Sequence, residues 1–124
     1  METLRIEPTS DTPRVVLDAS GGIFELSERC FPEDATQFFS PILEWVKNYS
    51  QSPNAVTEFN FKLEYYNTAS SKQLFKLFVL LHELSQKHQV VINWYYSASD
   101  TDMLSSGERY SKLLNFPFNM KEVE

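Results

Sequence analysis

Residues 67–84 of the chain read NTASSKQLFKLFVLLHEL, a group of small polar residues followed by an apolar-rich run. Ser and Thr often cap the first turn of a helix, where backbone N–H groups lack partners. Ser70 with Gln73 fits a capping box, and Thr68 as the N-cap would start the helix slightly earlier. The pattern therefore predicts a helix that includes Lys72–Lys87.

Thr68, Ser70 and Ser71 place three hydroxyl groups at the positive end of this helix dipole. In the simplest interpretation these hydroxyls only cap the helix. In the alternative interpretation one of them is a phosphorylation site. A helix N-terminus tolerates an anion, so a phosphate of about −1.5 to −2 charges would change the surface without unfolding the domain.

The predicted helix has a charged stripe and an apolar stripe on opposite sides. The apolar stripe, which we expect to face the core, consists of Leu74, Leu77, Phe78, Leu81 and Leu84. Phe75, Val79 and Leu80 lie at its boundary and widen the apolar arc. This width indicates either deep burial or a surface on which a partner docks.

A strand over Thr57–Tyr66 precedes the helix directly, because apolar and polar residues alternate along it. One face carries Phe59, Phe61, Leu63 and Tyr65, and the other carries Glu58, Asn60, Lys62 and Glu64. Only one face is apolar, so we expect helices on one side of the sheet and water on the other. Glu58 and Glu64 are interpreted as solvated residues rather than as an acid–base pair.

The β-branched and aromatic run of Gln89–Tyr96 predicts a second central strand. A strand, a helix and a strand in this order form a crossover, so the two strands should be parallel. After residues 97–100 a third helix is expected, with apolar positions at Met103, Leu104, Tyr110, Leu113 and Leu114. Gly107 would let this helix approach a neighbour closely. Asn115–Phe118 is predicted to form a last edge strand, where Pro is tolerated.

The N-terminal part predicts a strand at Leu4–Glu7, a loop over residues 8–13 and a hairpin connected by residues 18–22. Asp34 with Gln37 fits a capping box for the next helix, which ends at residues 50–54. Pro41 either bends this helix or begins a second one. The predicted fold is a single α/β (α+β) domain of residues 1–124. Its mixed sheet has about five to six strands, with helices packed on one face.

The composition favours a packed domain, since 42% of the 124 residues are hydrophobic and 15% are aromatic. The net charge of −6 disfavours binding to nucleic acids and to anionic membranes. No apolar run reaches the ~18 residues of a membrane span, and the N-terminus lacks the apolar region of a signal peptide. We therefore expect a cytoplasmic protein.

No arrangement of residues predicts catalysis, a metal site or a cofactor. Cys30 is the one cysteine, which excludes an internal disulfide, and it is interpreted as a buried structural residue. His82 and His88 are six residues apart and do not share a helical face. Asp100 and Asp102 are interpreted as residues that complement a helix dipole.

Several segments in order along the chain resemble the SiaC family of regulatory phosphoproteins, which are small STAS-like domains related in architecture to anti-sigma-factor antagonists. The segments are Pro13-Arg14-Val15 with Leu17-Asp18, Pro41-Ile42-Leu43-Glu44-Trp45, Tyr66-Asn67-Thr68 with Ser70-Ser71-Lys72, Trp94-Tyr95-Tyr96, Asp102-Met103-Leu104 with Gly107-Glu108, and Pro117-Phe118.

The resemblance implies a protein without catalysis of its own that is phosphorylated on Thr68, with Ser70 and Ser71 as alternative acceptors. It implies a dedicated serine/threonine kinase, a PP2C-type phosphatase and a diguanylate cyclase that the unphosphorylated form activates, linked to biofilm formation. The surface expected to bind the partner consists of Asn67, Thr68, Ser70, Ser71, Lys72, Phe75 and Val79.

Two other functions remain open from the sequence. The same fold serves as an anti-sigma-factor antagonist, and the open sheet face or the strand-to-helix turn is a place where a small ligand would bind.

Overall fold

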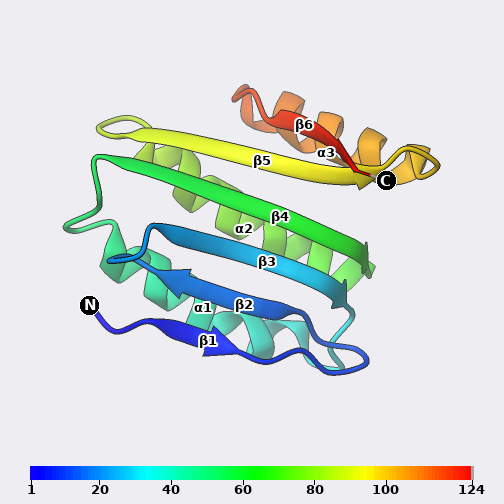
Figure 1. The fold of residues 1–124 in the computed structure, drawn as a ribbon, viewed down its shortest axis with the longest axis horizontal. Coiled ribbons are helices and arrows are strands. Elements are labelled where there is room, and N and C mark those ends of the chain that lie inside the picture. Colours follow the sequence, from blue (N-terminus) through cyan, green and yellow to red (C-terminus); the bar gives the residue numbers. More distant parts are fainter. Residues whose placement is uncertain (124) are drawn as a thin grey trace.

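The computed structural model describes residues 1–123, in which a six-stranded sheet is covered on one face by three helices (Figure 1). The elements in chain order are β1 (Leu4–Ile6), β2 (Arg14–Asp18), β3 (Ile23–Cys30), α1 (Ala35–Tyr49), β4 (Val56–Tyr66), α2 (Thr68–Leu84), β5 (Gln89–Ser97), α3 (Thr101–Leu114) and β6 (Asn119–Val123).

The strands lie in the sheet in their sequence order. β1, β2 and β3 form an antiparallel meander, whereas β3, β4, β5 and β6 are parallel. Each parallel pair is connected by one helix, and all of these helices lie behind the sheet in Figure 1. The predicted fold class is confirmed: the sheet is mixed and one of its faces is left open to water.

The core lies between the sheet and the helices. Every residue of the predicted apolar stripe of α2 is buried, from Leu74 to Leu84. Phe61 of β4, Phe78 of α2 and Trp94 of β5 are almost fully buried, and their rings pack together with centroids 4.9–6.1 Å apart. Aromatic contacts thus fix α2 on the two central strands.

Gly107 is a point of close contact between α3 and the sheet. A Cβ atom placed on Gly107 would lie 2.7 Å from Nε1 of Trp94 and 2.8 Å from its Cγ. The Trp94 Nε1–H also donates a hydrogen bond of 2.9 Å to the carbonyl of Met103. The absence of a side chain therefore allows α3 to lie against the indole, as predicted from the sequence.

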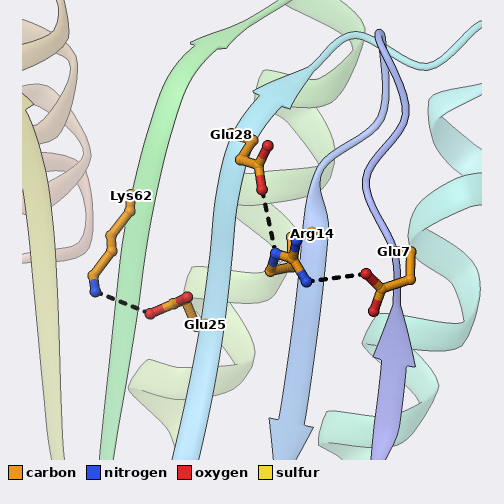
Figure 2. A network of polar contacts seen from close by, with 5 residues as sticks. All are labelled: Glu7, Arg14, Glu25, Glu28 and Lys62. Atoms are coloured by element: carbon orange, nitrogen blue, oxygen red, sulfur yellow. Dashed lines mark hydrogen bonds and ion pairs between the residues drawn. The ribbon is translucent and has the colours of Figure 1, made fainter.

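The open face of the sheet carries ion pairs between neighbouring strands (Figure 2). Arg14 lies between Glu7, at 3.1 Å, and Glu28, at 3.2 Å, while Lys62 pairs with Glu25 at 3.1 Å. Such partly exposed pairs each contribute about 0–1 kcal/mol, so their main effect is to keep this face polar.

The structure corrects the predicted N-cap of α2 and decides two points that the sequence left open in the other helices. The N-cap of α2 is neither Ser70 nor Thr68 but Asn67, whose Oδ1 accepts the Ser70 N–H at 2.9 Å. Pro41 does not begin a second helix, because α1 continues through it. Leu113 of α3 is 65% exposed and lies outside the core.

Two strand predictions also need correction. The β3–β4 register shifts between Glu28 and Arg29, so that Glu64 has no partner in β3. This bulge ends the alternation, and Tyr65 is 50% exposed instead of facing the core. The last strand is Asn119–Val123 rather than Asn115–Phe118, because Asn115 ends α3 in a left-handed conformation and the chain pairs only after Pro117.

Candidate functional site

The N-termini of α2 and α3 lie at the same edge of the sheet. Both helices begin where a strand ends, α2 after β4 and α3 after β5, and these two strands are parallel. Asn67 caps α2, and Asp100 caps α3 by accepting the Met103 N–H at 2.9 Å. Two helix dipoles therefore present their positive ends at this edge.

The three hydroxyl residues of the turn have different surroundings. Thr68 is the first residue of α2, is exposed, and makes no side-chain hydrogen bond with any residue from 1 to 123. Ser70 is fully buried beneath the first turn. Ser71 is half-buried, and its Oγ lies 2.5 Å from the Tyr110 hydroxyl. Of these three residues, Thr68 is the most exposed.

A hollow of about 550 Å³ opens beside Thr68 between the starts of α2 and α3. Glu64, Asp100 and Asp102 contribute carboxylates to its lining, and Arg109 contributes a guanidinium. The charge of the hollow is therefore predominantly negative. Sequence reasoning missed Arg109 as a neighbour of Thr68, since only the fold brings α3 to this place, and it interpreted Glu64 only as a solvated residue of the strand.

An exposed aromatic group adjoins the hollow. Tyr65 lines it and also packs edge-to-face on Phe31, with ring centroids 5.7 Å apart. The guanidinium of Arg29 lies over Phe31, 5.0 Å from the ring centroid. Tyr and Arg are enriched at the centres of protein interfaces, so this group extends the surface available to a partner.

The predicted partner-binding residues do not all share one surface. Thr68 and Lys72 are exposed, and Phe75 and Val79 are half-buried along the outer side of α2. Asn67 and Ser71 are half-buried at the turn, whereas Ser70 faces the interior. Without a change of conformation, Ser70 has no surface to offer a partner.

Burial keeps two groups near the turn, the Cys30 thiol and the Tyr110 hydroxyl, in their protonated form. Burial raises the pKa of the Cys30 thiol to about 11, which agrees with a structural rather than a reactive cysteine. Burial likewise raises the pKa of the Tyr110 hydroxyl, which therefore stays protonated and available to Ser71.

We expect Asn67→Ala to lower the free energy of unfolding by about 1 kcal/mol, because it removes the cap of α2. Thr68→Ala is the matched control, since the Thr68 side chain is exposed and makes no side-chain hydrogen bond within residues 1–123. Chemical denaturation of both variants measures the difference. Equal stability of the two variants would contradict the assignment of Asn67 as the cap.

The sequence profile of the SiaC family of regulatory phosphoproteins matches residues 6–123. The chain belongs to the SiaC family. An uncharacterized protein of Pseudomonas aeruginosa strain UCBPP-PA14 is 26% identical over 119 residues, which cover 95% of this chain and 94% of that protein. Because the members of this family are regulatory phosphoproteins, this chain is a regulatory phosphoprotein and not an enzyme.

Solved structures of SiaC from Pseudomonas aeruginosa have the same fold. One structure of SiaC superposes with a TM-score of 0.89 at 25% identity, covering 99% of this chain and 100% of that chain. SiaC in complex with the diguanylate cyclase SiaD, of which it is the activator, superposes with a TM-score of 0.90 at 25% identity. That match covers 97% of this chain and 99% of SiaC.

Residues 1–123 contain no group of three or more His, Cys, Asp or Glu side chains placed to hold a metal ion. None of the helices formed by these residues combines the length and apolar character that crossing a bilayer requires.

Proposed function

We propose that this protein binds and activates a diguanylate cyclase in its unmodified form and that phosphorylation of Thr68 blocks this activation. The observation that carries the proposal is the position of Thr68, which is exposed at the first residue of α2 in a SiaC-family chain. The structure of SiaC with the cyclase SiaD supports the choice of partner class.

The alternative acceptors are less suited to modification. The hydroxyl of Ser70 is enclosed in the core, so a kinase would reach it only after α2 had opened. Phosphate on Ser71 would break the short contact with Tyr110 and introduce a charge between α2 and α3. Phosphate on Thr68 does neither of these things, and the adjacent helix N-terminus favours the anion.

A phosphate on Thr68 would change the surface without disturbing the core. It would add about two negative charges beside Glu64, Asp100 and Asp102, which already line the hollow. A partner that covers this edge would then have to desolvate the phosphate and bear the repulsion of the carboxylates. Phosphorylation therefore opposes docking while the fold persists.

The switch requires two enzymes. In this proposal a serine/threonine kinase adds the phosphate and a PP2C-type phosphatase removes it, in the cytoplasm, where the cyclase finds its nucleotide substrate. The exposed position of Thr68 makes it accessible to both active sites. The protein itself supplies only the surface whose charge changes.

The direct test measures cyclic di-GMP formation by diguanylate cyclases from the organism that encodes this chain. Each cyclase is assayed with and without the purified unmodified protein. We expect cyclic di-GMP formation by one of these cyclases to rise when the protein is added, while the protein with GTP alone forms no product. If none of the cyclases responds, the proposed activation is refuted.

A further inference from the structure

Residues of α1 and α2 line a groove of about 300 Å³ between the two helices. Its apolar lining comes from Leu43 of α1 and from Phe75, Val79 and Leu80 of α2. All four side chains are half-buried, so one side of each contacts the protein and the other is left to water. The wide apolar arc of α2 thus continues into a concave surface.

Lysines line this groove. Lys47 and Lys76 belong to the groove itself, and an adjoining hollow of about 310 Å³ shares Lys47 and adds Lys87. Glu83 is the one carboxylate that lines either hollow among the described residues. Among lysines in residues 1–123, Lys62 alone makes an ion pair, so the groove lysines are free to pair with a partner.

We propose that this groove binds an acidic amphipathic helix of the partner cyclase, an inference that rests on the function proposed above. The apolar side of that helix covers Leu43, Phe75 and Val79, and its flanking carboxylates pair with Lys47 and Lys76. Charge complementarity selects this occupant, because the groove is locally positive in a chain whose net charge is −6.

The shape favours a helix over a membrane. Two helices packed side by side leave a groove into which a third helix fits by the same ridge-and-groove packing. An anionic membrane would meet a chain of net charge −6, and a concave groove inserts little apolar surface into lipid. A second copy of the same acidic chain would likewise be repelled as a whole.

The proposed helix site and the modification site lie on one side of α2. Thr68, Lys72, Phe75 and Val79 follow helical spacing, and the rise of α2 places Phe75 about 10 Å along the axis from Thr68. This distance exceeds the Debye length of about 8 Å at physiological ionic strength only slightly, so part of the repulsion between exposed charges persists. A phosphate on Thr68 would therefore repel an acidic helix at the end of its groove.

The test uses the full chain and the cyclase that the unmodified protein activates. Lys47→Glu combined with Lys76→Glu reverses the charge of the groove, and we expect it to weaken cyclase binding by about tenfold or more. Lys112→Glu combined with Lys121→Glu is the matched control, because it changes the net charge equally at exposed positions outside the groove. The control should bind as the unaltered protein does.

A photo-crosslinker placed at Val79 identifies the occupant. We expect it to capture a helical segment of the cyclase that carries Asp or Glu beside its apolar positions. The groove assignment is overturned if both double variants bind alike, while loss of binding in Thr68→Glu would still support the proposed switch. It is also overturned if the crosslinker at position 79 captures a second copy of this chain. A third contrary result is that the groove lysines are needed for binding to anionic vesicles but not for binding to the cyclase.

Discussion

Thr68→Glu is expected to lose cyclase activation and to weaken cyclase binding by about tenfold or more, equivalent to about 1.4 kcal/mol of binding free energy. The carboxylate places a charge at the exposed first residue of α2, beside a hollow that Glu64 and Asp102 already make acidic. A partner that covers this edge must desolvate the new charge. Titration of each variant against the cyclase gives the affinity.

The matched control for this variant is Thr68→Gln, because the Gln side chain has nearly the same size as that of Glu and carries no charge. It should bind the cyclase as the unmodified protein does. Both variants should keep the free energy of unfolding within about 0.5 kcal/mol of the unaltered protein, because residue 68 is exposed and a helix N-terminus favours acidic side chains. Equal cyclase binding by the Glu and Gln variants would argue against a charge-controlled switch.

Gly107→Val is expected to produce the largest loss of stability, about 3 kcal/mol. Its Cβ would lie 2.7 Å from Nε1 of Trp94, and the indole is 1% exposed and hydrogen-bonded to the Met103 carbonyl. Any shift of Trp94 would therefore disturb the buried core and this hydrogen bond. Either α3 separates from β5 or the aromatic core rearranges.

Ser105→Val, at an exposed position of the same helix, controls for the placement of a β-branched side chain in α3. We expect it to change the free energy of unfolding by only a few tenths of a kcal/mol. Urea denaturation followed by tryptophan fluorescence measures both variants. If Gly107→Val were as stable as Ser105→Val, the close packing of α3 on Trp94 would be wrong.

Periodic patterns in the sequence were sufficient to predict the layers of the fold. The apolar stripe of α2 and the alternation of β4 up to Leu63 depend on residues close in sequence, and both were confirmed. The alternation failed at Tyr65 because the bulge at Glu64 arises from pairing with β3, which is distant in sequence. Local sequence patterns do not predict such a register shift.

The candidate site was less predictable in its details. The sequence analysis considered only Thr68 and Ser70 as the N-cap, although Asn67 is equally acceptable. The structure distinguishes them by burial, since a helix capped by Asn67 turns Ser70 into the core. The proximity of Arg109 and Asp102 to Thr68 follows from the parallel crossover that brings α3 to the same edge as α2.

The most direct measurement compares the full-length protein carrying phosphothreonine at position 68 with the unmodified protein in binding to the cyclase and in cyclic di-GMP formation. We predict that the phosphorylated protein binds more weakly by about tenfold or more and fails to activate, and that a PP2C-type phosphatase restores both properties. Equal affinity and equal activation by the two forms would contradict the proposed switch at Thr68.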